Sequence, residues 1–544
     1  MFLLFRSVTF LNLIAITCAL TQKTKIEVLV TLQYEMPGYV TNAVFMSPTF
    51  EVARDEVMKR HRGQYNVSVR YFQHKDHHTC DDINGDAVAN VSEYLFRHRR
   101  EDTCYAIVET GCNDQNGLSS FATALDVLVF TLNMDSMAKD FLTPKSAPAT
   151  TVSSGASSIS FCMALVELLN RNNWYHVTVV IETSTTITRF YQTSWRFLLE
   201  VTKHSGFNFQ MVPLNVDNII STPDLMKILA ESKLRSRVYV LLSTAKLALR
   251  IMGLTDALGM SNGEYVFINV QPIRTTAYGV PAQFARLANN TSNLNASRSL
   301  IFLVPQSHSP TAKTLADVNE KISNLTLTQY NYSYNGVPPL DSGNGARGAI
   351  EIVEIFSTLV IERDSALLGS GQDGPCSGSQ LVDRIANRTF TISSGRVYFT
   401  AGGIRLINTE VFAFNTSTLS LQTIGVFDGT KQRFTFYENK TIPWPTSDGS
   451  PPADVPECGF TGHEGRCAAE RTSTIITALS TAAGCILLLA GSAYYRWFRQ
   501  QLFESENYWV LQRKDLVLPG YTCQSRISLL FSCISLKSQR GIEL

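Results

Sequence analysis

Residues Thr472–Tyr495, TSTIITALSTAAGCILLLAGSAYY, divide this chain into two unequal parts. The stretch contains no charged residue and is bounded by Arg471 and Arg496. As a helix it would be roughly 36 Å long, enough to cross a hydrocarbon core of about 30 Å with some tilt. A buried helix of a soluble protein seldom continues so far without a charge. We therefore predict a transmembrane helix at 472–495, preceded by a stalk at 441–471.

Flanking residues predict the orientation of this span. Residues 1–20 are typical of a secretory signal peptide, because Arg6 precedes a short apolar run and small residues lie near Ala19. Basic residues, Arg496 and Arg499 among them, follow the span directly, as expected for a cytosolic side. We predict a single-pass type I protein of the plasma membrane, with a short cytoplasmic tail at 496–544.

All the Asn-x-Ser/Thr glycosylation sequons precede the span, which agrees with an extracellular N-terminal part. Their asparagines are Asn66, Asn90, Asn289, Asn290, Asn295, Asn324, Asn331, Asn387, Asn415 and Asn439.

The net charge and the cysteine count limit the functions that the chain can have. The formal net charge of the 544 residues is +1, with no long run of one sign, so nothing indicates nucleic-acid binding. Seven cysteines lie between the signal and the span, and most should pair in an oxidising compartment. Because seven is odd, at least one is free or bonded to another chain. They are Cys80, Cys104, Cys112, Cys162, Cys376, Cys458 and Cys467.

The N-terminal part alternates strands and helices. Apolar, β-branched runs such as Ile26–Leu32 predict strands covered on both faces, and amphipathic stretches separate them. This pattern predicts an α/β fold with doubly wound, mainly parallel sheets. It restarts after a loop at 143–158, so the binding region at 21–440 should contain two lobes. We predict a first lobe at 25–155 with return segments after 298, and a second lobe at 156–297.

The lobes should meet at a cleft beside the carboxyl ends of their strands, where open α/β sheets bind ligands. After the lobes, Ser379–Phe390 predicts an amphipathic helix. Short strands at Arg396–Thr400, Thr409–Asn415 and Leu419–Phe427 should then close the fold.

No motif indicates catalysis or a metal. The chain lacks Gly-x-Ser-x-Gly, a phosphate-binding Gly-x-x-x-x-Gly-Lys and His-Glu-x-x-His. Histidines, an aspartate and a cysteine gather in 74–80, but zinc sites need a second ligand pair some distance away. We interpret this segment as a polar loop that leads to a disulfide cysteine.

The stalk sequence Ile442–Cys467, IPWPTSDGSPPADVPECGFTGHEGRC, is stiffened by proline and ends in two cysteines that a disulfide could join. It resembles the stalk of the natriuretic-peptide receptors and receptor guanylate cyclases. Trp444-Pro445, Pro451-Pro452 and the run Val455–Phe460 match that family's motif in order.

The resemblance extends over most of 25–516. Ile385–Gly395 is similar to the family's Asn-Arg-Thr-Phe segment, and Trp509–Leu516 to the segment before its kinase-homology domain. It implies a type I periplasmic-binding-protein fold, a dimer with itself or with related receptors, and an extracellular peptide or small-molecule ligand. It also implies a disulfide between Cys80 and Cys112. Cys104, at the start of the intervening strand, is the competing partner of Cys80. The N–H groups of Gly111 and Cys112 would form a chloride site.

Two departures from the family matter. Glu109-Thr110-Gly111-Cys112 stands where natriuretic receptors have Gly-Pro-x-Cys, so the resemblance does not imply a natriuretic peptide as ligand. The tail contains neither a kinase-type glycine-rich loop nor His-Arg-Asp, and it is too short for a cyclase.

Three hypotheses follow. The first is a ligand-binding receptor without catalytic domains, acting as a clearance or decoy receptor, as a partner of full-length subunits, or as a truncated product. The second is a complete guanylate cyclase whose gene continues beyond this chain. The third is a surface solute-binding or adhesion module. None of them makes the chain as written an enzyme.

Overall fold

The computed structural model describes residues 25–506 of the chain, apart from internal gaps. The gaps are 34–41, 62–63, 74–79, 111–115, 133–148, 156–157, 184–188, 273–296, 307–312, 335–337, 343, 371–375, 416–417, 439, 447 and 463. The chain forms two units, Met1–Gly465 and Arg466–Leu544, and each is described by itself.

The first lobe contains a five-stranded sheet of parallel strands. Its strands are β1 (Lys25–Thr31), β2 (Asn66–Phe72), β3 (Thr103–Glu109), β4 (Leu128–Thr131) and β5 (Thr151–Ser153). They lie side by side in the order β2-β1-β3-β4-β5, and all neighbours are parallel. Every residue of β3, TCYAIVE, is buried. That is the pattern of a strand covered on both faces.

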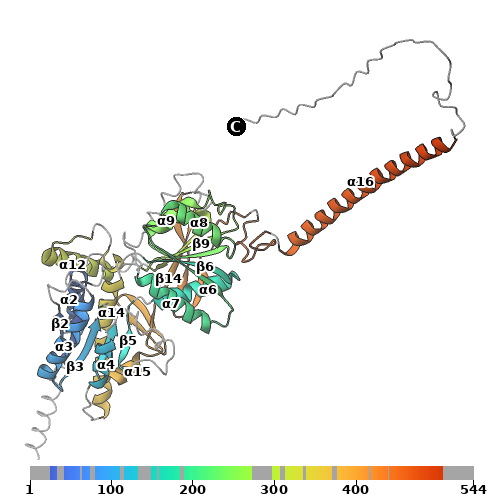
Figure 1. Ribbon diagram of the computed structural model, residues 1–544. Helices are drawn as coiled ribbons and strands as arrows, with labels where there is room; N and C mark the ends of the chain where they lie inside the picture. Colours follow the sequence, from blue (N-terminus) through green and yellow to red (C-terminus); the bar gives the residue numbers. More distant parts are fainter. Residues whose placement is uncertain are drawn as a thin grey trace, which may run out of the picture. The chain divides into compact units, whose positions relative to one another are not determined.

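Helices cover both faces of this sheet (Figure 1). α2 (Ala43–Arg60), α12 (Lys313–Tyr330) and α14 (Asn344–Ser370) share one core cluster, and α3 (Cys80–His98) and α4 (Asn116–Ala124) share another. In the first cluster Phe130 of β4 packs against Phe356 of α14, with ring centroids 6.4 Å apart. The first lobe is therefore completed by segments that follow the second lobe in sequence.

The second lobe contains an eight-stranded mixed sheet in the order β16-β15-β14-β10-β9-β8-β6-β7. From β10 to β7 the neighbours are parallel, whereas β14, β15 and β16 are antiparallel to their neighbours. The strands are β6 (His176–Glu182), β7 (Gln210–Val216), β8 (Val238–Leu242), β9 (Val266–Val270), β10 (Leu300–Pro305), β14 (Thr409–Asn415), β15 (Ser420–Asp428) and β16 (Arg433–Phe436).

Helices also cover both faces of the second sheet. α6 (Ser158–Arg171) and α7 (Arg189–His204) pack on one face, and α8 (Thr222–Ser232) and α9 (Ala245–Leu254) on the other. Ser221 caps α8, because its side chain accepts a hydrogen bond from the N–H of Asp224. The predicted α/β fold with doubly wound sheets is confirmed, and the antiparallel extension is an addition to it.

Two boundaries predicted from the sequence are wrong. β10 pairs with β9, so the chain returns to the first lobe only at α12, not directly after residue 298. The predicted helix at Ser379–Phe390 ends earlier: α15 (Gly378–Ile385) stops because Asn387 adopts a positive φ of 54° and Arg388 begins a strand.

A small third sheet follows α15 in the chain and precedes β14. β11 (Arg388–Ile392), β12 (Gly395–Phe399) and β13 (Arg405–Leu406) form it, and the short helix α13 (Pro339–Ser342) precedes α14. Phe390 and Phe399 belong to the first-lobe core, whereas Leu406 belongs to a second-lobe core. This sheet is therefore shared by the cores of both lobes.

The described part of the second unit belongs to one long helix, α16 (Gly465–Glu506). Within it, Ile475–Phe503 is long and apolar enough to cross a membrane. This agrees with the span predicted at 472–495, and the helix continues for about three turns beyond it. The predicted signal at 1–20 lies outside the described residues, as does the tail after 506.

Candidate functional site

Three polar side chains lie at the carboxyl ends of neighbouring second-lobe strands. Ile181 pairs with Leu242, and Leu241 pairs with Asn269, so Glu182, Ser243 and Gln271 follow in register on β6, β8 and β9. Neighbouring strands are about 4.8 Å apart, which makes these side chains a continuous row. All three are fully buried. We call Glu182, Ser243 and Gln271 the polar row.

Only some of the side-chain atoms in the polar row have hydrogen-bond partners within the described residues. Glu182 Oε2 accepts from the N–H and hydroxyl of Thr244, at 2.7 and 2.8 Å, and so caps α9. Gln271 Nε2 donates to Asn269 Oδ1 at 2.9 Å, and Asn269 Nδ2 donates to the Ser243 carbonyl.

Three oxygens in this row have no hydrogen-bond partner among the residues that the structure describes. They are Glu182 Oε1, Ser243 Oγ and Gln271 Oε1. A buried oxygen without a partner costs free energy until a donor reaches it. Because the Glu182 and Gln271 oxygens can accept hydrogen bonds, the row suits a donor such as an ammonium or hydroxyl group.

The first lobe also has a buried carboxyl at a strand end. Glu109 is the last residue of β3 and is 5% exposed. Burial raises the pKa of Glu109 to about 8, and a hydrogen bond with Thr131 opposes that rise. Glu109 is therefore mostly a neutral acid at pH 7. Its neighbour Thr110 donates to the carbonyl of Thr31 at the end of β1.

An ion pair connects the first-lobe helix α14 to the strand β13. Glu351 is fully buried, and its two oxygens lie 2.6 and 2.7 Å from Nε and Nη2 of Arg405. Arg347 donates from Nε to the same carboxylate at 2.9 Å. Burial, with Arg347 nearby, lowers the pKa of Arg405 to about 10, although Glu351 opposes that shift.

The main chain around Arg405 is held by the second lobe. Ser160 of α6 donates to the Arg405 carbonyl and accepts from the N–H of Ile407 at 3.2 Å. Ile407 itself belongs to a second-lobe core. The buried Arg405–Glu351 pair therefore joins an element of each lobe.

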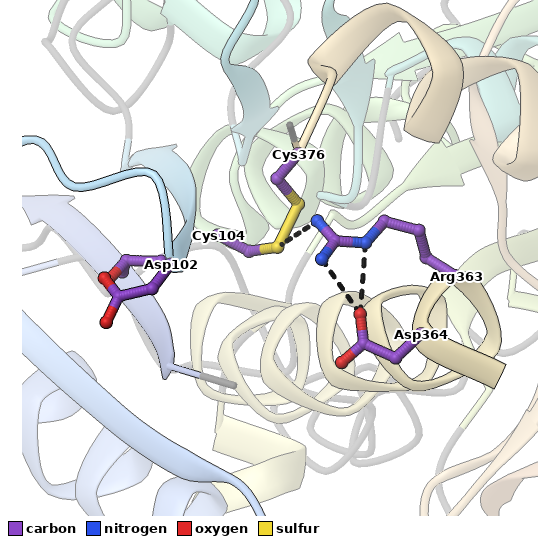
Figure 2. The surroundings of a disulfide bond; sticks show 6 residues. Asp102, Cys104, Arg363, Asp364 and Cys376 are labelled. Carbon is purple, nitrogen blue, oxygen red and sulfur yellow. Dashed lines mark hydrogen bonds and ion pairs between the residues drawn. A yellow bond between two sulfur atoms is a disulfide. The ribbon is translucent and has the colours of Figure 1, made fainter. Parts of the chain in front are cut away.

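A disulfide that the sequence left unassigned joins two distant segments of the first lobe. Cys104 of β3 is bonded to Cys376, with Cα atoms 5.3 Å apart. Figure 2 shows Arg363 beside it, donating from Nη1 to Cys104 Sγ at 2.9 Å and pairing with Asp364. Since Cys104 is used here, it is not available as the competing partner of Cys80. Cys162 is a free, buried thiol in α6.

The other predicted cysteine pairs are not tested directly. Gly111 and Cys112 lie outside the described residues, as does the side chain of Cys80, so the Cys80–Cys112 bond and the chloride site stay predictions. Cys458 and Cys467 are each disulfide-bonded. The polar loop at 74–79 also lies outside the described residues.

Peptide mapping without reduction checks these pairs. We expect peptides linked through Cys104–Cys376, Cys80–Cys112 and Cys458–Cys467. Because Cys104 is bonded to Cys376, it cannot be the alternative partner of Cys80. Recovery of Cys458 joined to a cysteine of another chain would contradict the third pair.

Most of the predicted glycosylation sites that the structure describes are accessible. Five sequon asparagines are exposed: Asn66, Asn90, Asn324, Asn331 and Asn387. Asn415 is half-buried and donates to Gln422 Oε1 at 3.1 Å, while Asn289, Asn290, Asn295 and Asn439 lie outside the described residues. All five exposed asparagines lie in or beside β2, α3, α12 and β11, and none lies in the strands β6 to β10.

The stalk packs on the amino-terminal edge of the second-lobe sheet. Asp454 Oδ1 accepts from the N–H groups of Tyr175 and His176 at 3.0 and 2.9 Å, where β6 begins. Asp454 Oδ2 lies 2.7 Å from Nδ1 of His176. The buried Trp174 donates from Nε1 to the Pro452 carbonyl at 2.8 Å.

Further contacts hold the start of the stalk. Trp174 and Trp444 meet edge to face with ring centroids 5.8 Å apart. Arg298 donates to the carbonyls of Pro443 and Trp444, both at 2.9 Å. The motif residues of the stalk therefore have a packing role: they attach residues 443–454 to the second lobe.

The family of the chain follows from a comparison with protein families. The model of the ANF receptor family, described as the receptor family ligand-binding region, matches residues 46–417. That match covers more than half of the chain and includes elements of both lobes, from α2 to β14. The chain belongs to this family of receptor ligand-binding regions, which natriuretic-peptide receptors share with other receptors.

Proposed function

We propose that this chain is a single-pass cell-surface receptor related to the receptor guanylate cyclases, and that residues 1–544 by themselves make no cyclic GMP. The observation that carries this proposal is the match to a receptor ligand-binding region over 46–417. The apolar segment Ile475–Phe503 supports a membrane anchor behind that region. The guanylate-cyclase relationship rests on the stalk motif from Trp444 to Cys467.

The ligand in this proposal carries a hydrogen-bond donor. The polar row offers a carboxylate oxygen, an amide oxygen and a hydroxyl without partners at the strand ends, where open α/β sheets bind ligands. An ammonium group of a peptide or a small amine would satisfy them. The Arg405–Glu351 pair would stay intact while the lobes close on the ligand, because it lies at their connection.

Dimerisation, with itself or with related full-length receptors, belongs to the same proposal and rests on the family resemblance alone. So does a chloride bound by the N–H groups of Gly111 and Cys112.

The test uses cells that lack related receptors and express the full chain. A panel of peptides, amino acids and biogenic amines is screened for saturable surface binding, and cyclic GMP is measured in the same cells. We expect binding of an amine-bearing compound that is weakened by Glu182→Gln, with cyclic GMP at background. Glu264→Gln is the matched control, since Glu264 is 57% exposed and outside the polar row.

Two results would count against the proposal. Binding that tolerates Glu182→Gln would remove the polar row as the ligand contact. A ligand-dependent rise in cyclic GMP would show a catalytic activity that the proposal excludes, since nucleotide cyclisation needs metal-binding carboxylates and a basic group on the triphosphate.

A further inference from the structure

The amino-terminal edge of the second-lobe sheet is where the chain leaves the ligand-binding region. Asp454, Pro452 and Trp444 hold the stalk to Trp174, Tyr175 and His176, all at the start of β6. Phe460 continues along the same edge: its ring lies 5.5 Å from that of His176 and 5.7 Å from the guanidinium of Arg237, just before β8. The stalk therefore ends at this edge.

Exposed apolar side chains gather at the same edge. Phe207 (45% exposed) precedes β7, Val455 (42%) follows Asp454 at the start of β6, and Leu234 (58%) precedes β8. Since β7, β6 and β8 are neighbours in the sheet, these three residues form a row across its edge. We call Phe207, Val455 and Leu234 the amino-edge patch.

Other exposed apolar residues of this lobe are placed differently. Ile219, 83% exposed, follows β7 and lies at the opposite, carboxyl-terminal edge. Leu419, in the turn between β14 and β15, is at the amino-terminal edge but close to the sequon at Asn415, where a glycan would keep it from a flat surface. No sequon asparagine of the described residues lies beside β7, β6 or β8.

The chain between this edge and the apolar helix is short. The N–H of Glu464 donates to the carbonyl of Cys458 at 2.9 Å, so the residues between them return to where they started. α16 begins at Gly465, and the apolar segment begins at Ile475, ten residues or about 15 Å of helix later. The headgroup layer takes up about 5–7 Å of that length. Whatever the direction of the helix, the edge cannot lie far from the lipid surface.

We propose that the amino-edge patch rests on the lipid surface of the membrane that anchors the chain, with its apolar side chains among the headgroups. This inference rests on the membrane anchoring proposed above. Amphipathic and apolar side chains favour this interface, and the short tether makes even a weak contact effective because the local lipid concentration is high.

The charges around the patch indicate the kind of lipid. Lys203, Lys233 and Arg235 are balanced by Glu200, Glu231 and Glu457 along the same edge. A balanced surface has no preference for anionic lipid, so it fits zwitterionic headgroups such as phosphatidylcholine.

Photo-crosslinking of the full chain in phosphatidylcholine vesicles tests the contact. The photoreactive residue p-benzoyl-phenylalanine replaces Phe207, Leu234 or Val455, one at a time, and lipid adducts are identified by mass spectrometry after illumination. The exposed positions should tolerate this change. We expect lipid adducts at all three positions and their loss when the probe replaces Ile219, the exposed residue at the opposite edge.

A probe in place of Leu488, within the apolar helix, tests the membrane anchoring separately from the contact of the amino-edge patch. Adducts at Leu488 without adducts at the patch would overturn the contact alone. No adducts at Leu488 would overturn the membrane anchoring and the contact with it. Crosslinks from the patch to a second copy of the chain, in place of lipid, would also overturn the contact and indicate a protein interface.

Discussion

Glu351→Gln should destabilise the ligand-binding region by about 3–5 kcal/mol, the typical cost of removing one partner of a buried ion pair. The substitution leaves Arg405, which is 2% exposed in its side chain, without the carboxylate that it contacts through two nitrogens. It also leaves Arg347 as a second positive charge nearby. Thermal unfolding of the purified full chain, followed by circular dichroism, measures the loss.

Glu362→Gln is the matched control for this prediction. Glu362 forms a two-bond pair with Arg388, but the two side chains are 38% and 35% exposed. Solvent screens such a pair, so its loss should cost at most about 1 kcal/mol. The double variant Glu351→Leu with Arg405→Met should recover part of the stability, because the fully buried Arg405 charge is removed together with its partner. Arg347, 18% exposed in its side chain, loses the carboxylate but keeps its hydrogen bond to the Gln306 carbonyl. Equal losses in the two single glutamine variants would contradict the role of burial.

Glu109→Gln should stabilise the protein at pH 8 by an amount on the order of 3–5 kcal/mol, with little effect near pH 4.5. The pKa of Glu109 is about 8 in the folded protein, against an ordinary value of 4.5. Between these values the unfolded chain releases the proton and the folded chain keeps it. The stabilising contribution of Glu109 is therefore complete below pH 4.5 and is lost as the pH rises to about 8.

Melting temperatures measured from pH 4.5 to pH 8.5 check this prediction. The difference between Glu109→Gln and the parent chain should grow with pH and level off above pH 8. Glutamine keeps the size of the side chain and its hydrogen-bonding capacity toward Thr131 but cannot ionise. A difference that does not change with pH would mean that Glu109 is ionised when folded.

The sequence predicted the strands of the fold better than it predicted the helices. Continuous apolar runs such as Ile26–Leu32 mark strands buried on both faces, and β1 begins and ends one residue before that predicted range. α2 begins at Ala43 and contains Pro48, although proline favours the first turn of a helix. Burial of Ala43, Met46 and Phe50 and the Asn42 cap outweigh that preference.

The sequence of α12 contains a signal that could have marked it as a helix. Leu315, Val318 and Ile322 repeat at helical spacing and are all buried. β5 and β13 could not be recognised in this way, because they are three and two residues long and depend on pairing with distant strands.

Most residues of the candidate site could not be identified from the sequence. Glu182 and Glu109 are each a carboxylate that ends an apolar strand, and that pattern could have marked them. Gln271 and Ser243 become neighbours of Glu182 only through the β6-β8-β9 register. The pairing of Glu351 with Arg405 joins residues on α14 and β13, and no spacing in the chain indicates it.

The bond between Cys104 and Cys376 has a consequence for biosynthesis. The ribosome synthesises Cys104 272 residues before its partner Cys376, and the parallel strands of the second lobe, β6 to β10, are made in that interval. The helices α12 and α14, which cover one face of the first sheet, also appear only late. During that interval the nascent first lobe has one face of its sheet uncovered and an unpaired thiol at Cys104, while the parallel strands of the second lobe are made. Its dependence on chaperones and oxidoreductases should be concentrated in that period.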